Sequence, residues 1–421
     1  MAAPLSLAQH LQRAATENPH ADALLHAGKR LSFAQLADIS RALAGRLASR
    51  RGAIIEAGDS PHLAQHAYAC SFQNRPFFPV DRSNAHQEID QPLTDVALII
   101  ASSGSEGKPR AVLLGNAQLD AAAAASNERL PLHPGDRWLN CLPLYHIGGQ
   151  SILWRCARAG ATVLLHDGFD ADQVAIDLAA QPVTHISLVP AMLARLLDLG
   201  AKPPASLRVA LIGGAALSQS LYERAVAADW PLYPSYGMSE TAAQFATFDP
   251  SDGPWREGMV GRTMPGHDIR VGTDGRLQVR GPQVMRGYLD GSGIDADGWL
   301  TTGDLGQIDP SGRLSILGRA DDMLISGGRN VHPQEVESCL AGCPGVVDVA
   351  VIGRPDPVWG DLIVALVVGP VSPDNLLAHA RRHLPSAALP RQIHAVERLP
   401  RNATGKLERA ALRRLAAEAA P

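Results

Sequence analysis

The chain has 421 residues, of which 46% are hydrophobic and 19% are charged, and its formal net charge is −4. This composition indicates a folded globular protein of two or more domains and excludes an intrinsically disordered chain. Because acidic and basic residues nearly balance and no region is strongly basic, a nucleic-acid-binding function is disfavoured.

The first part of the chain predicts alternating helices and strands. In residues 31–52, Leu36, Ile39, Leu43 and Leu47 recur at helical spacing, and Ser32 is expected to cap the helix. The apolar run at 96–100 predicts a buried strand, and a further helix is expected to begin with Asn116 as its cap. Alternation to about residue 300 predicts a layered α/β architecture with parallel strand pairing.

A smaller α+β unit is expected near the C-terminus. Its alternating segments are residues 346–353 and 361–369, and its helical stretches are residues 333–342 and 374–384. We therefore predict two domains, a large α/β region of several subdomains at residues 1–318 and a small mobile α+β domain at residues 319–421.

Cysteine usage and the N-terminus bear on the compartment. The five cysteines (Cys70, Cys141, Cys156, Cys339 and Cys343) are thinly spread, and no cysteine–histidine set completes a metal site. We expect reduced or buried thiols and a cytoplasmic protein. The first residues lack the basic start and apolar core of a signal peptide, and no apolar run approaches the ~20 residues of a membrane span.

The loop ASSGSEGKPR at residues 101–110 directly follows the predicted buried strand. A glycine-rich turn in this position can direct backbone N–H groups at a phosphate, although a flexible surface turn explains the loop equally well. Only two residues separate Gly104 from Gly107, and Pro109 follows Lys108, so a Walker-type phosphate loop is disfavoured.

Four further stretches carry groups that a nucleotide reaction needs: residues 211–218, 233–244, 301–309 and 400–412. Each has an ordinary explanation when taken alone: a core aromatic for Tyr236, a solvated or capping acid for Glu240, a turn aspartate for Asp304 and a solvated lysine for Lys406. Together and in this order, they supply a ring-stacking aromatic, a metal carboxylate, a ribose carboxylate and a mobile lysine after a phosphate loop.

With these motifs the chain resembles the adenylate-forming superfamily of acyl-CoA synthetases, peptide-synthetase adenylation domains and beetle luciferases over nearly its whole length. The resemblance implies a nucleotide site made of Ser102, Ser103, Gly104, Ser105, Gly107, Lys108, Gly213, Gly214, Ala215, Ala216, Tyr236, Gly237, Ser239, Asp304 and Arg319. Glu106 and Arg110 depart from the commonest residues of the family's phosphate loop, and Glu106 would repel a triphosphate unless it turned away or a metal bridged it.

The resemblance also implies individual roles for these residues. Tyr236 would stack on adenine, Ser239 would bond the α-phosphate, Glu240 would hold Mg²⁺, and Asp304 and Arg319 would contact ribose. Asp321 matches the hinge and Lys406 the catalytic lysine, while Gly327 and Gly328 would line the tunnel for the CoA thiol. ATP, Mg²⁺ and CoA are thus the expected cofactors and substrates, and Lys406 would offset negative charge when a carboxylate attacks the α-phosphate.

Residues 138–165 resemble the acyl-pocket motif of the superfamily, with His146 at the gating position. Within them Gly149-Gln150 and Trp154-Arg155, together with residues 184–197, look most like o-succinylbenzoate–CoA ligases, and Arg155 is a candidate for binding a second substrate carboxylate. A packed core histidine and an inter-helix or surface arginine are the alternatives. The short segment at 82–101 could reshape the pocket for another aryl acid. The rival functions are a stand-alone enzyme that loads a carrier-protein pantetheine, and an inactive nucleotide sensor or scaffold. The presence of Glu240, Asp304 and Lys406 argues against the second rival.

Overall fold

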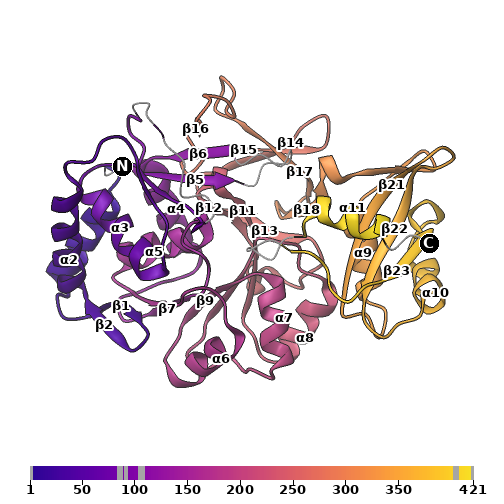
Figure 1. Ribbon diagram of the computed structural model, residues 1–421, viewed down its shortest axis with the longest axis horizontal. Helices are drawn as coiled ribbons and strands as arrows, with labels where there is room; N and C mark the ends of the chain where they lie inside the picture. The colour runs from indigo at the N-terminus through magenta and orange to yellow at the C-terminus, as the bar shows by residue number, and fades with distance from the viewer. Residues whose placement is uncertain (1–2, 83–88, 90–92, 103–109, 402–406, 419–421) are drawn as a thin grey trace.

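The computed structural model describes residues 3–82, 89, 93–102, 110–401 and 407–418. Three β-sheets carry the helices, and the chain progresses from an N-terminal helical layer through a long central sheet to a small C-terminal unit (Figure 1). The architecture is the predicted mixed α/β fold, with a large N-terminal part and a small C-terminal part.

The parallel half of the 13-stranded central sheet follows the predicted alternation. Its strands run in spatial order β8 (Thr162–Leu165), β7 (Arg137–Asn140), β9 (His185–Leu188), β10 (Val209–Ile212) and β11 (Leu232–Met238). The connecting helices are α5 (Ile147–Ala159), α6 (Ala171–Ala180), α7 (Pro190–Asp198) and α8 (Gln219–Ala227). At the far edge lie β1 (Asp22–His26), parallel to β8, and β2 (Lys29–Ser32), antiparallel to β1.

The expected alternation to about residue 300 is wrong beyond β11. Residues 239–319 contain only short 3₁₀ turns between strands, and these strands pair antiparallel. In the central sheet these strands are β12 (Ala243–Thr247), β13 (Met259–Thr263), β14 (Asp268–Val271), β15 (Arg276–Arg280), β17 (Leu300–Ile308) and β18 (Leu314–Arg319). Their connections lack the helical crossover that a parallel pair requires.

A second sheet presents the glycine-rich loop. It is ordered β16 (Gly287–Tyr288), β6 (Arg110–Leu114), β5 (Leu98–Ser102), β4 (Phe77–Pro79) and β3 (Ile54–Glu56). Leu98, Ile99 and Ile100 are buried, which confirms the predicted strand. Helix α4 (Asn116–Arg129) follows β6, but its N-cap is Gly115 and not Asn116, and the Gln118 side chain accepts from the Gly115 N–H at 3.1 Å.

The N-terminal helices α1 (Leu7–Glu17), α2 (Phe33–Leu47) and α3 (Ser60–Phe72) pack on one another; α3 lies against β3 and β4 of this second sheet, and α2 lies against β1 and β2 of the central sheet. Ser32 caps α2 as predicted: its hydroxyl accepts from the Gln35 N–H at 3.2 Å, and the Gln35 side chain accepts from the Ser32 N–H at 2.9 Å. Leu36 and Leu47 are buried, whereas Ile39 is 37% exposed because the buried face turns through Ala37 and Ser40 instead.

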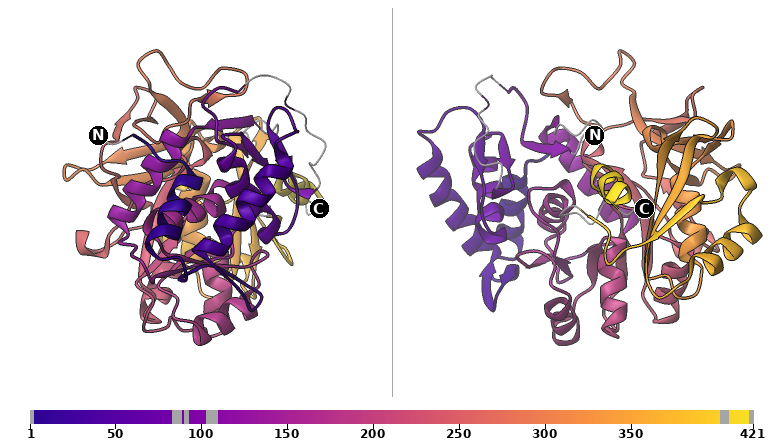
Figure 2. Two further views of the ribbon diagram at one scale, coloured as in Figure 1. Left: turned by 90° about the vertical axis from the view of Figure 1, so that its left-hand side faces the viewer. Right: turned by 45° about the vertical axis from the view of Figure 1, so that its right-hand side comes forward.

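The third sheet forms the small C-terminal unit (Figure 2). Its strands are β19 (Leu324–Ser326), β20 (Arg329–Val331), β21 (Asp348–Asp356), β22 (Gly360–Val368) and β23 (Gln392–Ala395), and its helices are α9 (Pro333–Ala341), α10 (Pro373–His383) and α11 (Arg409–Glu418). The central sheet ends at Arg319 and the third sheet begins at Leu324. A domain boundary after residue 318 stays a prediction.

The cysteines of the described residues are free, and four of them are buried; Cys339 is half-buried. This agrees with the expectation of reduced or buried thiols. In the described ranges, no helix has both the length and the apolar character needed to cross a membrane.

Removal of the α2 cap gives a first test of this local structure. Ser32→Ala leaves the Gln35 N–H without its side-chain partner and should lower the free energy of unfolding by about 1 kcal/mol. Urea denaturation followed by circular dichroism measures the change. Ser49→Ala, at an exposed position after the helix, is the matched control. Equal losses in the two variants would show that the capping box does not stabilise α2.

Candidate active site

The turn after β10 exposes backbone at the carboxyl edge of the parallel strands. Gly213 donates its N–H to the Leu188 carbonyl at 3.1 Å, and the next three residues, Gly214, Ala215 and Ala216, are exposed. A Cβ on Gly213 would lie 2.9 Å from the Ser235 hydroxyl, so glycine keeps this turn close to β11. In a parallel sheet, ligands bind at this edge.

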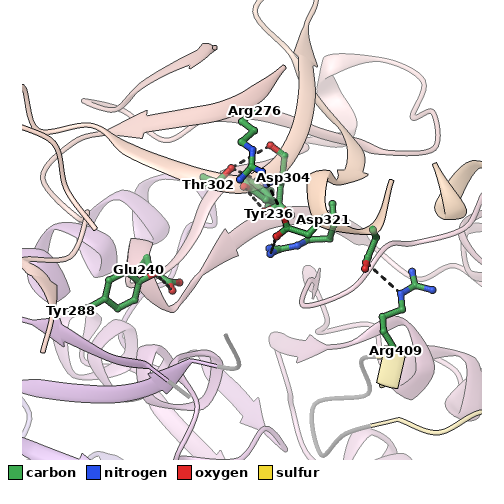
Figure 3. Close-up of polar contacts among 10 residues, drawn as sticks. Tyr236, Glu240, Arg276, Tyr288, Thr302, Asp304, Asp321 and Arg409 are labelled. Atoms are coloured by element: carbon green, nitrogen blue, oxygen red, sulfur yellow. Dashed lines mark hydrogen bonds and ion pairs between the residues drawn. The ribbon is translucent and has the colours of Figure 1, made fainter. Parts of the chain in front are cut away.

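Tyr236 and Asp304 meet beside this turn (Figure 3). Tyr236 lies in β11, and its phenol donates to Asp304 Oδ2 at 2.9 Å. Asp304 in β17 is opposite Arg319 in β18, and the Arg319 guanidinium lies 3.4 Å from Asp304 Oδ1. The structure therefore brings together three of the predicted nucleotide-binding residues, which come from three strands.

Burial raises the pKa of Tyr236 well above its ordinary value, and the neighbouring Asp304 carboxylate raises it further. The phenol is thus a permanent donor at neutral pH. The other carboxylate oxygen of Asp304, Oδ1, faces Arg319. Because Arg319 is partly exposed, a polar ligand can reach this side of the cluster.

Asp321 extends this cluster toward the C-terminal unit. It lies in the 3₁₀ turn at Ala320–Asp322, where Arg276 approaches it at 3.3 Å and Arg319 at 3.5 Å. The adjacent Asp322 pairs instead with Arg409 of α11 at 3.3 Å (Figure 3). Burial lowers the pKa of Arg409, but Glu337 and Asp322 outweigh that effect and raise it above its usual range.

Glu240 has a partner that the sequence did not indicate. Tyr288 donates its phenol to Glu240 Oε1 at 2.9 Å, and the Arg110 guanidinium lies 3.4 Å from the centre of the Tyr288 ring. Figure 3 shows Glu240 and Tyr288 facing one another. Burial raises the pKa of Tyr288, and Glu240 raises it further, so Tyr288 stays protonated and donating. The two residues are 48 positions apart in the chain, so no local pattern signals this contact.

Gly237 and Ser239 lie between Tyr236 and Glu240, where strand β11 ends and a 3₁₀ turn begins. A Cβ on Gly237 would lie 2.0 Å from the Ala243 carbonyl oxygen, so no other residue fits without movement of β12. Ser239 begins the 3₁₀ turn Ser239–Thr241, which also carries Glu240. The end of β11 and the 3₁₀ turn thus present Tyr236 and Glu240 from one short segment.

The predicted phosphate loop is described only at its ends. Ser103, Gly104, Ser105, Gly107 and Lys108 lie outside the described residues, as does Glu106. Ser102 is the last residue of β5 and pairs with Arg110 of β6; its hydroxyl donates to the Arg110 carbonyl at 3.2 Å. The loop therefore leaves and re-enters the second sheet at a paired position.

His146 precedes α5 in a tightly bonded loop. The buried Gln150 side chain donates to the Leu144 carbonyl at 2.7 Å, and a Cβ on Gly149 would lie 2.5 Å from the Pro143 carbonyl oxygen. The Tyr145 and His146 rings are 4.6 Å apart. Because this loop follows β7, His146 lies at the same carboxyl edge as the Gly213 turn.

Arg155 lies elsewhere. Its guanidinium is 5.1 Å from the Trp138 ring centre, and Trp138 stacks on His185 at the amino ends of β7 and β9. Asn127 of α4 donates to the Arg155 carbonyl at 3.0 Å, and burial lowers the pKa of Arg155 to about 10. This position, opposite the carboxyl edge, favours the alternative of a packed inter-helix arginine.

Gly327 and Gly328 form the turn between β19 and β20, with φ angles of +56° and +74°. Two successive left-handed residues favour glycine for the hairpin itself, whether or not a ligand passes there. Lys406 lies outside the described residues; the neighbouring Arg401 and Leu407 pair as an isolated bridge.

Two family models match the chain: the AMP-binding enzyme model over residues 68–289 and the AMP-binding enzyme C-terminal domain model over residues 335–406. A 2-succinylbenzoate–CoA ligase of Bacillus licheniformis is 38% identical over 332 residues, which cover 75% of this chain and 70% of that protein. A 2-succinylbenzoate–CoA ligase of Staphylococcus aureus is 36% identical over 327 residues, 75% of this chain and 66% of that protein.

Solved structures are similar over nearly the whole chain. The o-succinylbenzoate CoA synthetase of Bacillus subtilis with its acyl-adenylate intermediate superposes with a TM-score of 0.86 at 29% identity, covering 98% of each chain. The same protein with ATP and a magnesium ion gives a TM-score of 0.84 at 30% identity, covering 96% of this chain and 99% of that chain.

The buried phenol of Tyr236 predicts a loss of stability in alkali. Because its pKa is raised in the folded state, the unfolded chain loses this proton first, and stability falls as pH rises past about 10. When the pH rises from about 8 to about 10.5, the free energy of unfolding of Tyr236→Phe should fall by about 0.8 kcal/mol less than that of the parent. Urea unfolding at both pH values measures this, and identical losses would contradict a buried, protonated Tyr236.

Proposed function

The chain belongs to the AMP-binding enzyme family, and from this membership and the site geometry we propose that it is an ATP-dependent acid–CoA ligase. In the first half-reaction, a substrate carboxylate attacks the α-phosphate of ATP, giving an acyl-adenylate and pyrophosphate. In the second, the CoA thiol attacks the acyl carbonyl, giving the thioester, AMP and a proton. The chain is thus an acid–thiol ligase.

The observation that carries this proposal is the cluster of Tyr236, Asp304 and Arg319 beside the exposed turn at Gly213. The turn admits a flat ring against backbone, and Tyr236 lies next to it for stacking. Asp304 can accept from ribose hydroxyls through an oxygen that also faces Arg319. These groups are of the kinds that an adenosine moiety needs: a backbone face for the ring and an acceptor for the ribose.

Glu240 fits Mg²⁺ by the chemistry of its carboxylate. Tyr288 takes up Oε1, while no hydrogen bond from a described residue reaches Oε2, which leaves a hard oxygen ligand. Bound there, Mg²⁺ would neutralise charge on the phosphates. Tyr288 of β16 holds the carboxylate in place, and Arg110, at the start of the strand that follows the phosphate loop, packs on the Tyr288 ring.

The phosphate-loop residues and Lys406 complete the proposed chemistry. Ser102 and the loop residues through Lys108, apart from Glu106, would bind the β- and γ-phosphates, with Ser239 near the α-phosphate. Lys406 would supply a compact positive charge where two anions meet. Arg401 and Leu407, which flank the segment of this lysine, pair as an isolated bridge.

We propose 2-succinylbenzoate as the acid, on the basis of the relatives' activity. His146 is the proposed pocket residue, since the loop after β7 places it at the ligand edge. Arg155 is not assigned to the substrate's second carboxylate, because it packs at the opposite ends of the strands. Another aryl acid is the alternative substrate, because the short segment at 82–101 could reshape the acid pocket.

Free CoA is the proposed acceptor, and a carrier-protein pantetheine is the alternative. The glycine pair Gly327–Gly328 and the hinge at Asp321 are proposed to admit the thiol after the C-terminal unit rotates. Free rather than paired cysteines fit a reducing compartment, so we place the enzyme in the cytoplasm.

Pyrophosphate exchange with 2-succinylbenzoate tests the proposed function, and Lys406→Ala tests the role of the lysine. Loss of this charge should slow adenylation by about 10²- to 10³-fold, while thioester formation from preformed acyl-adenylate should change little. Lys202→Ala, at an exposed position, is the control. Exchange in Lys406→Ala as fast as in the parent would exclude the lysine from the chemistry.

Thioester formation on a carrier protein but not on CoA would favour the alternative acceptor.

Tyr288→Phe tests the support of Glu240. Without the phenol, Glu240 loses a hydrogen bond worth about 1 kcal/mol or more, so the Mg²⁺ concentration for half-maximal exchange should rise by roughly 5- to 20-fold. The KM for the acid should stay near that of the parent. Tyr222→Phe is the control, because that ring stacks on Trp255 away from the site. An unchanged Mg²⁺ requirement would mean that Tyr288 does not position the metal ligand.

A further inference from the structure

A second group of ligand-bearing side chains lies outside the proposed active site. Glu56 ends strand β3, and His62 and His66 lie one turn apart on α3. Their ligand atoms are all within 4.8 Å of one another, and in the described part of the chain no other such group of three is found. His62 Nε2 is 3.1 Å from Glu56 Oε2, and His66 Nε2 is 3.9 Å from Glu56 Oε1.

The helix start sets the direction of the two imidazoles. Asp59 caps α3 by accepting from the His62 N–H at 2.9 Å, so His62 stands in the first turn and His66 in the next. Two histidines at this spacing point from the same helix face, as in helical metal-binding motifs. Here that face is turned toward Glu56 at the edge of the second sheet.

The absence of a side chain at Gly58 leaves space for the His62 ring. Its φ lies outside the left-handed region, so the backbone does not demand glycine there. A Cβ on Gly58 would, however, lie 2.6 Å from the His62 ring. The glycine is thus explained by the imidazole that packs on it, and it holds the ring against the carboxylate.

His66 has the hydrogen bond that a metal-binding histidine usually makes. Its Nδ1 lies 2.8 Å from the His62 carbonyl, which can only accept, so Nδ1 carries the proton. In the neutral ring, Nε2 then offers a lone pair. That lone pair and the Glu56 carboxylate are both electron-rich and face the same small volume.

From this geometry we propose that Glu56, His62 and His66 bind one Zn²⁺. Two imidazole nitrogens and a carboxylate oxygen are a ligand set typical of zinc, and hard cations such as Mg²⁺ and Ca²⁺ prefer oxygen ligands alone. Ligand atoms of tetrahedral zinc lie about 3.3 Å apart; the His62–Glu56 separation of 3.1 Å is near this value, and the His66–Glu56 separation of 3.9 Å would have to shorten. His62 is 40% exposed, so the ion can enter from solvent and water can fill the fourth position.

Arg50 is the competitor for this site. Its guanidinium lies 2.5 Å from Glu56 Oε1 and neutralises the same carboxylate that would bind zinc. Removal of this cation should therefore strengthen zinc binding. A purely structural histidine–glutamate cluster would predict no such gain.

Calorimetric titration of ZnSO₄ into the tag-free, chelator-treated full-length chain tests the proposal. The parent should bind one more equivalent than His62→Ala/His66→Ala. His66→Ala alone should weaken that site by at least about 10-fold, and Arg50→Gln should tighten it several-fold. His20→Ala, which removes an exposed histidine outside the group, is the control.

Thermal unfolding gives a second readout that needs no catalytic activity. Zinc should raise the melting temperature of the parent and of His20→Ala, but not that of the double variant. Circular dichroism of the double variant without zinc checks that it folds. Equal zinc stoichiometry in the parent and the double variant, or no tighter binding in Arg50→Gln, would overturn the proposal.

Discussion

The hydrogen bond from Tyr236 to Asp304 joins the two halves of the central sheet where the nucleotide is proposed to bind. Tyr236 closes the parallel half, and Asp304 belongs to the antiparallel half. A phenol buried this deeply must donate or lose the free energy of its hydrogen bond, and a carboxylate is a strong acceptor. The same bond therefore stabilises the sheet junction and orients the carboxylate. Binding chemistry and folding stability are coupled at this point.

Several motif residues meet structural demands as well as proposed functional ones. Gly237 is required because a side chain would collide with the Ala243 carbonyl, and Gly327 and Gly328 are favoured by a left-handed hairpin turn. The glycine of such a motif cannot by itself distinguish a ligand site from a tight turn. Polar neighbours help to distinguish the two: Tyr236, the residue before Gly237, donates to Asp304, which also pairs with Arg319, and these groups are suited to a nucleotide.

The sequence predicted what local patterns determine and missed what distant contacts determine. The Ser32 cap and the buried strand at Leu98 follow from neighbouring residues, and both are present. The antiparallel half was missed, because strand order depends on connection geometry and not on hydrophobic period. The contact of Tyr288 with Glu240 joins segments far apart in the chain, and Arg155 could be placed only after β7 and α4 were arranged around it.

At the proposed hinge, the adjacent carboxylates of Asp321 and Asp322 form ion pairs with different parts of the molecule, the central sheet and helix α11. Asp321 pairs with Arg276 and Arg319 of the central sheet, and these side chains are substantially exposed. Asp322 pairs with Arg409 of α11, which is more deeply placed and also reaches Glu337. Exposed pairs contribute only about 0–1 kcal/mol each, whereas breaking a more buried pair costs more. Rotation about Asp321 would therefore break the exposed pairs, while Arg409 and α11 would move as part of the C-terminal unit.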